Sequence, residues 1–170
     1  MPYPFTRLVA PGWSLFRADP AVGDEHLVRF PRAATRATRY QLPIFLGARS
    51  RVILSGTDHD FIVAPGQCSL DTPVDEYPAG CLWTETPIEP GAIRLCLAAA
   101  PVGFHLRRWT REMLELPAGG AAEASGDLLL LMSGPAEIDG VAAKPGDYTL
   151  DGRLVASESC RILRARLQPT

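Results

Sequence analysis

The feature that most constrains this chain is the alternation of short apolar runs with turn residues across residues 126–152. The run Leu128–Met132 has the length of a strand and is apolar throughout, which is typical of a strand buried on both faces. Turn signals then interrupt the chain three times, at Ser133–Gly134, Asp139–Gly140 and Pro145–Gly146. Since Asp-Gly is a strong hairpin signal, we expect three short strands joined by tight turns.

An earlier part of the chain repeats this order of signals. Ser55–Gly56 precedes Ser133–Gly134 by 78 positions, and Pro65–Gly66 precedes Pro145–Gly146 by 80 positions. An insertion of two residues in the second hairpin would account for the difference between the two offsets. Because repeats at a fixed offset indicate repeated supersecondary units, the sequence predicts an internal duplication.

The composition indicates an all-β protein with a substantial core. The 170 residues are 46% hydrophobic, and the 15 Gly and 16 Pro lie between short apolar runs. This distribution predicts frequent turns and almost no helix, with 110–116 as the one stretch where a helix would be no surprise. We expect an N-terminal arm with the first strands over 1–39, a first repeat over 40–98 and a second repeat over 99–170, packed as one compact unit.

Several of the turn motifs resemble those of a known family. Pro117–Gly119, Gly134, Gly140 and Pro145–Asp147 stand where the cupin superfamily carries comparable residues, and the paired units resemble its two-copy members. The likeness covers residues 115–167 well, residues 40–98 less well and the N-terminal arm not at all. The resemblance implies a jelly-roll barrel, or double-stranded β-helix, of six to eight antiparallel strands per copy.

The resemblance also implies where a metal would bind. Most catalytic cupins hold a divalent metal with an H-x-H pair, a Glu and a third His, which converge on an open coordination position. In the second copy the Glu position falls on Asp127, and the H-x-H pair falls on Ala121 and Glu123 or on Gly120 and Ala122. In the first copy the corresponding residues are Arg49, with Pro43 and Phe45 or Leu42 and Ile44. We therefore expect no metal and no other cofactor.

Four residues are the candidate ligand-binding residues that the sequence offers. His59 lies between Asp58 and Asp60 on a polar turn, which would either bind a metal or be simply solvated. Glu123 and Asp127 would form a carboxylate pair at the mouth of the second barrel, or act as solvated loop acids. Cys81 is the cysteine to test as a nucleophile, although acids nearby in the chain would disfavour its thiolate. The remaining cysteines lie in or beside apolar strands and are expected to be buried thiols, namely Cys68, Cys96 and Cys160.

Charge is distributed unevenly along the chain, although the net charge is only −2. Residues 1–55 contain eight arginines and three acids, whereas residues 56–92 contain seven acids and neither lysine nor arginine. Residues 73–91 are expected to form a long acidic loop around a short strand at 81–84, and such loops often carry function. A polar strand or loop is favoured for the basic stretch, with an anion-binding stripe as the alternative: Arg29, Arg32, Arg36 and Arg39.

No feature of the sequence points to nucleic acid or to a membrane. The net charge is small, and no apolar run approaches the roughly 20 residues that a membrane span needs. The N-terminus lacks the basic and apolar regions of a signal peptide. The four cysteines form no C-x-x-C motif, so we predict a cytoplasmic protein with reduced thiols.

These observations lead to three functional hypotheses. The leading one is a metal-free, cupin-like protein that binds a small molecule or has a structural role, with binding favoured over catalysis. The alternatives are a metal-independent acid–base enzyme of small-molecule metabolism and a protein-interaction module that uses the acidic 73–91 loop. A small molecule and a second copy of the chain, in a homodimer, are the partners that these hypotheses allow.

Overall fold

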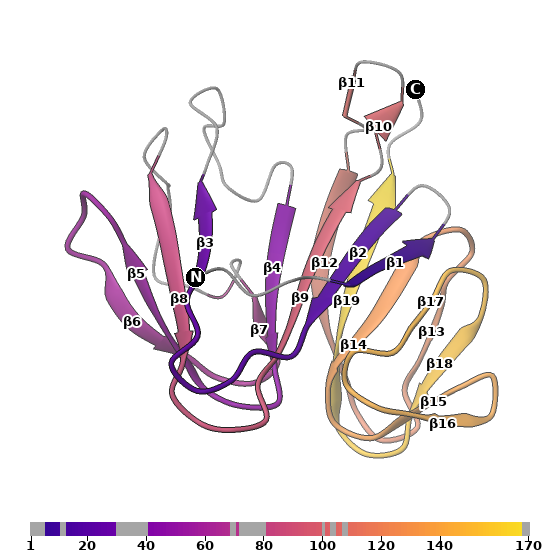
Figure 1. Ribbon diagram of the computed structural model, residues 1–170. Coiled ribbons are helices and arrows are strands. Elements are labelled where there is room, and N and C mark those ends of the chain that lie inside the picture. Colours follow the sequence, from indigo (N-terminus) through magenta and orange to yellow (C-terminus); the bar gives the residue numbers. More distant parts are fainter. Residues whose placement is uncertain are drawn as a thin grey trace. The chain divides into compact units, whose positions relative to one another are not determined.

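The computed structural model describes residues 6–10, 13–29, 41–68, 71, 81–99, 101–102, 105–106 and 109–167 (Figure 1). The chain divides into two compact units, Met1–Pro101 (unit 1) and Val102–Thr170 (unit 2). The arginines at 32, 36 and 39 and the acids at 75 and 76 lie outside the described residues. Strands and turns make up nearly all of what is described, so the all-β prediction is confirmed. Within the described residues, no helix has the length and apolarity that a membrane crossing needs.

Unit 1 contains two antiparallel sheets (Figure 1). The first has the order β1-β2-β9-β4-β7, and the second has the order β3-β8-β5-β6. The strands of the first sheet are β1 (Thr6–Ala10), β2 (Trp13–Ala18), β4 (Gln41–Leu46), β7 (Gln67–Cys68) and β9 (Ile93–Ala99). Those of the second are β3 (His26–Arg29), β5 (Ser50–Leu54), β6 (Asp60–Val63) and β8 (Leu82–Pro87).

Unit 2 also contains two antiparallel sheets, with the orders β12-β19-β14-β17 and β13-β18-β15-β16. The first comprises β12 (Trp109–Leu116), β14 (Leu128–Ser133), β17 (Tyr148–Thr149) and β19 (Cys160–Leu167). The second comprises β13 (Ala121–Glu123), β15 (Ala136–Ile138), β16 (Val141–Ala143) and β18 (Arg153–Ala156). A short pair, β10 (Pro101–Val102) and β11 (His105–Leu106), completes the strands of the described residues. Every residue of the apolar run 128–132 is buried, as the sequence predicts.

The two units share one topology. The order β2-β9-β4-β7 in unit 1 corresponds to β12-β19-β14-β17 in unit 2, and β3-β8-β5-β6 corresponds to β13-β18-β15-β16. In each of these sheets a strand from the start of the unit pairs with a strand from its end, and strands from its middle lie beside them, which is the jelly-roll arrangement. Duplication of one barrel is the interpretation that we propose for this correspondence.

The predicted match between the two Ser-Gly pairs is wrong. Ser133 ends β14, whereas Ser55 follows β5, which belongs to the other type of sheet. The counterpart of β14 is β4, which is followed by Gly47, so Gly47 is the residue equivalent to Gly134. Both glycines have positive φ, and a Cβ on either would collide with a backbone oxygen just before the last strand of its unit. Only glycine fits both constraints.

The predicted match between the two Pro-Gly pairs is confirmed. The Gly66 N–H donates to the carbonyl of Phe45 (2.6 Å), and the Gly146 N–H donates to that of Leu131 (2.8 Å), before β7 and β17. Phe45 and Gly66 are 21 positions apart, whereas Leu131 and Gly146 are 15 apart. The extra residues therefore lie in unit 1, where the β5–β6 turn is longer, and not in the second hairpin as predicted.

Candidate functional site

The interior of unit 1 is lined by one face of each sheet. Along β5 and β8 buried and more exposed residues alternate, because successive side chains of a strand point to opposite faces. The inward apolar residues form one cluster, with the Trp83 ring stacked on Phe45 at 5.8 Å between centroids and 10° between planes. Phe61 meets Trp83 edge-on at 6.3 Å. Buried polar side chains share this interior, and one of them, Arg94, lies against Phe45.

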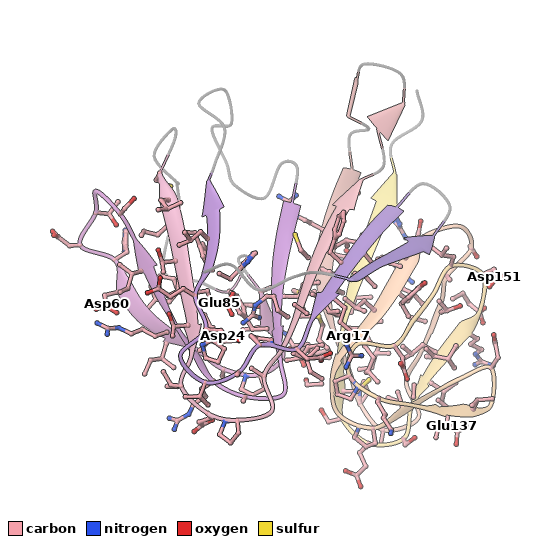
Figure 2. All side chains as sticks on the ribbon, viewed as in Figure 1. Arg17, Asp24, Asp60, Glu85, Glu137 and Asp151 are labelled. Atoms are coloured by element: carbon pink, nitrogen blue, oxygen red, sulfur yellow. The ribbon has the colours of Figure 1, made fainter. Side chains whose placement is uncertain are left out.

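A buried ion pair joins the two sheets of unit 1. Arg94 of β9 contacts Glu85 of β8, and the two side chains are 1% and 0% exposed. Arg94 Nη1 also donates to the carbonyl of Ile44 (2.8 Å), and Nη2 donates to Ser50 Oγ (3.2 Å). The Arg94 guanidinium lies over the Phe45 ring, with Cζ 3.9 Å from the centroid, in a cation–π contact. Glu85, labelled in Figure 2, thus lies at the polar centre of the barrel.

His26 lies next to this pair. It is the residue directly opposite Glu85 in the pairing of β3 with β8. Burial, and after it the positive charge of Arg94, lowers the pKa of His26 to about 4. The imidazole is therefore neutral at pH 7, with one ring nitrogen as donor and the other as acceptor. The cluster of Ser50, Glu85, Arg94 and His26 is called the polar cluster below.

Glu85 retains capacity to accept hydrogen bonds. Arg94 contacts its Oε1, while Oε2 accepts no hydrogen bond from any residue that the structure describes. A buried polar atom without a partner is costly, and such atoms call for a specific explanation in a native protein. Oε2 of Glu85 is therefore a buried acceptor that the described residues leave unused.

The shared topology identifies the residue of unit 2 that corresponds to each member of the polar cluster. Ser50 pairs with Pro87 at the start of β5, and Ala136 pairs with Ala156 at the start of β15. The adjoining hydrogen bonds agree, since Ile88 N donates to the Arg49 carbonyl and Ser157 N to that of Pro135. Phe45 and Leu131 also correspond, because their carbonyls accept the equivalent hydrogen bonds from Gly66 and Gly146. Counting along the paired strands from these two matches gives all four equivalents: Ala136 for Ser50, Leu154 for Glu85, Ala122 for His26 and Ile162 for Arg94.

All four equivalents in unit 2 are apolar and buried in a single core cluster. The same barrel therefore packs with alanine, leucine and isoleucine where unit 1 has a serine, a carboxylate, an imidazole and a guanidinium. Replacing a buried ion pair by well-packed apolar residues is often neutral or stabilising. The fold itself does not require the polar cluster, which marks it as the candidate functional site.

The structure places His59 on the turn between β5 and β6. Its backbone N–H donates to Thr57 Oγ1 (3.1 Å), and the side chain is partly exposed. The neighbouring carboxylate of Asp60, labelled in Figure 2, accepts a hydrogen bond from Arg51 Nε (2.8 Å). Among the described residues, no three His, Cys, Asp or Glu side chains gather as a set of metal ligands. The structure therefore does not bring His59, Asp58 and Asp60 together as such a set.

Cys81 lies in the apolar cluster of unit 1, beside Trp83, and is only 6% exposed. Burial raises the pKa of its thiol, so the thiolate is disfavoured by desolvation and not by neighbouring acids. Burial also raises the pKa of Cys96, to about 12. All four cysteines are buried free thiols, as expected for three of them from the sequence.

Glu123 and Asp127 are each held by a different arginine. The exposed Glu123 carboxylate lies 3.3 Å from Arg153, its partner across β13 and β18, and Asp127 accepts a hydrogen bond from Arg166 (2.7 Å). Arg164 donates to the Glu123 carbonyl (3.1 Å) and lies 3.7 Å from the Asp127 carboxylate. Their role as ligand-binding residues stays a prediction.

The polar cluster is not predicted from the sequence. Glu85 was expected in a long acidic loop, but it lies in the six-residue strand β8 and is fully buried. One signal in the sequence indicates this placement. Arg94 is the single charge in the apolar run 92–100. A lone charge in a strand of this kind predicts a buried partner.

Comparison with known proteins supports the fold. No protein-family model and no curated protein sequence matches the chain. Among solved structures, it is similar to a cupin 2 conserved barrel domain protein from Leptotrichia buccalis, with 14% identity, 96% of this chain and 88% of that chain covered, and a TM-score of 0.55.

Two further structures are similar. One is a salicylate 1,2-dioxygenase from Pseudaminobacter salicylatoxidans (8% identity, 95% and 75% covered, TM-score 0.55). The other is the protein Ylba from E. coli, of the family model DUF861 (12% identity, 96% and 82% covered, TM-score 0.53). At these identities the likeness concerns the fold alone. The chain has the all-β jelly-roll fold of cupin proteins.

Proposed function

We propose that the protein binds a small molecule in the interior of unit 1, and that the polar cluster forms its binding site. One observation carries the proposal: unit 1 holds an ion pair, a serine and a histidine at positions where the same barrel in unit 2 has only apolar residues. Groups that the fold does not need, and that cost desolvation, are typical of functional sites. A neutral imidazole beside a carboxylate suits hydrogen bonding to a polar ligand.

The experiment compares wild type with a variant that carries the residues of unit 2. Glu85→Leu together with Arg94→Ile copies Leu154 and Ile162 into unit 1. A thermal-shift screen of polar metabolites should give ligands that raise the Tm of wild type, since a ligand that binds only the folded state stabilises it. These ligands should leave the Tm of the double variant unchanged.

Glu89→Gln serves as the matched control. Glu89 forms an exposed ion pair with Arg49 at the turn after β8, away from the interior, so this variant should respond to ligand as wild type does. A screen without any hit would count against binding altogether. Hits that shift the double variant as much as wild type would place the binding site elsewhere.

Catalysis without a metal is the second candidate function. It is favoured by a specific observation, the position of a neutral His26 directly opposite the Glu85 carboxylate. Such a pair can take up and return a proton, which is the chemistry of general acid–base catalysis. Incubating each hit with the protein and following it by mass spectrometry and NMR distinguishes turnover from binding. Conversion that stops in Glu85→Gln would favour the enzyme.

The interaction-module alternative has less support in the described part of the 73–91 segment. Of its acids there, Glu85 is buried in the barrel and Glu89 is paired with Arg49. Neither presents a free negative charge to a basic partner surface. Small-molecule binding is therefore the better proposal.

A further inference from the structure

The chemistry of the polar cluster restricts the kind of ligand that it can recognise. An ionised carboxylate only accepts hydrogen bonds, at two oxygens with about four lone-pair sites. Arg94 contacts one oxygen of Glu85, and the other accepts no hydrogen bond from the described residues although the side chain is fully buried. What the site offers is thus an oriented acceptor.

The two terminal nitrogens of Arg94 are already engaged. Arg94 uses its two terminal nitrogens on the Ile44 carbonyl, on Ser50 Oγ and on Glu85, and one face of its guanidinium lies on the Phe45 ring. An acidic ligand that paired with these terminal nitrogens would have to displace Glu85 from Arg94. It would also bring a second negative charge beside a buried carboxylate, which is strongly unfavourable.

We infer that the ligand of unit 1 is recognised through its own N–H or O–H donors, which Glu85 accepts, and that it carries no acidic group at this point. This inference rests on the proposed function and specifies its ligand class. Arg94 then acts as the fixed counter-charge that orients Glu85. A hydrogen bond to a charged group is stronger than one between neutral groups, so Glu85 would dominate recognition.

Three probes of the same size and shape test the inference: acetamidine, acetamide and acetate. They share one heavy-atom skeleton. Acetamidine presents only hydrogen-bond donors, acetamide presents donors and an acceptor, and acetate presents only acceptors. The NMR signal of the Trp83 indole N–H reports on the interior, because Trp83 packs in its core. Titration at pH 7.5 should shift this signal with acetamidine and acetamide, and acetate should bind at least roughly tenfold more weakly than acetamidine.

Glu85→Gln is the variant that isolates the acceptor. The substitution keeps the shape of the side chain and adds an N–H₂ donor, so the preference for acetamidine over acetate should fall by roughly tenfold or more. Glu89→Gln should keep the wild-type preference. A preference for acetamidine over acetate that persists in Glu85→Gln would overturn the inference.

The wild-type titrations decide the matter even where Glu85→Gln does not fold. Acetate that binds as tightly as acetamidine, or the absence of any shift with all three probes, would overturn the inference. The proposed function fails on different grounds, when the polar-metabolite screen gives no hit that depends on the Glu85–Arg94 pair. A screen whose hits are all acids would keep the proposed function and overturn the ligand class.

Discussion

The Glu85–Arg94 pair illustrates how much a single residue depends on its partner. Glu85→Leu alone leaves Arg94 buried without its carboxylate, and should lower the free energy of unfolding by roughly 3–5 kcal/mol. Adding Arg94→Ile should recover the lost stability and leave the protein as stable as wild type, or more stable by up to about 4 kcal/mol. Urea unfolding of the two variants and wild type measures both effects. A double variant as unstable as the single one would mean that the fold needs the pair.

His26 predicts a dependence of stability on pH. Its folded-state pKa of about 4 is below the ordinary value of 6.5, so the unfolded chain takes up the proton first. The contribution of neutral His26 to stability is therefore complete above pH 6.5, and is lost as the pH falls from 6.5 towards 4. Glu85 and Arg94 are the charged groups of the polar cluster that lie beside it.

The measurement is urea unfolding at pH 7 and pH 4.5. His26→Gln should lose less stability between these values than wild type, because it has no imidazole to protonate. The exposed carboxylates with lowered pKa, Asp60 and Glu89, titrate equally in both proteins and cancel in the comparison. Equal losses in both proteins would show that His26 is not held neutral by its surroundings.

Among the strands, β14 gives the clearest prediction about packing. Leu129 and Leu131 are fully buried and belong to the core cluster of unit 2. Each should cost roughly 2–5 kcal/mol when changed to Ala, through lost burial and the cavity that remains. Val141→Ala, at a residue that is 69% exposed on β16, should cost far less. Denaturant unfolding that finds both leucine variants near wild type would exclude a buried β14.

The turn after β14 makes a second prediction at this scale. Gly134→Ala and Gly140→Ala both place a side chain at positive φ, which costs about 1–2 kcal/mol. A Cβ at Gly134 also collides with the carbonyl of Ser159, whereas the space around Gly140 is open. Gly134→Ala should therefore be the more destabilising in thermal unfolding. Equal losses in Tm would mean that the contact with Ser159 relaxes without cost.

The positions of strands and turns are more predictable from the sequence than the pairing of strands and side chains. The run 128–132 and the two Pro-Gly turns were placed correctly because period, composition and turn chemistry are local signals. Ser55–Gly56 was matched to the wrong strand, since a dipeptide does not reveal which sheet a strand joins. The sequence predicts a loop at Glu85, because the residue that explains its burial, Arg94, lies on the opposite sheet. Pairing across a barrel is a non-local property, and one sequence does not encode it in any short motif.

For the whole molecule, the expectation of a metal-free protein gives a direct test. The described residues include no group of three metal-ligating side chains. Protein purified without added metal should contain much less than one transition metal ion per chain by elemental analysis. Incubation with a chelator should leave its Tm unchanged, because no ligand of the folded state is removed. One tightly bound iron, zinc, manganese or nickel ion per chain would contradict this expectation.

The shared topology has a consequence for protein engineering. Each member of the polar cluster has an equivalent position in unit 2. The cluster can therefore be introduced into the apolar barrel by four substitutions: Ala122→His, Ala136→Ser, Leu154→Glu and Ile162→Arg. The natural chain supplies both the donor sequence and the recipient scaffold, with the strand pairing already matched. Under the proposed function, a chain altered in this way would carry two binding sites of one kind, and its ligand stoichiometry would rise from one to two.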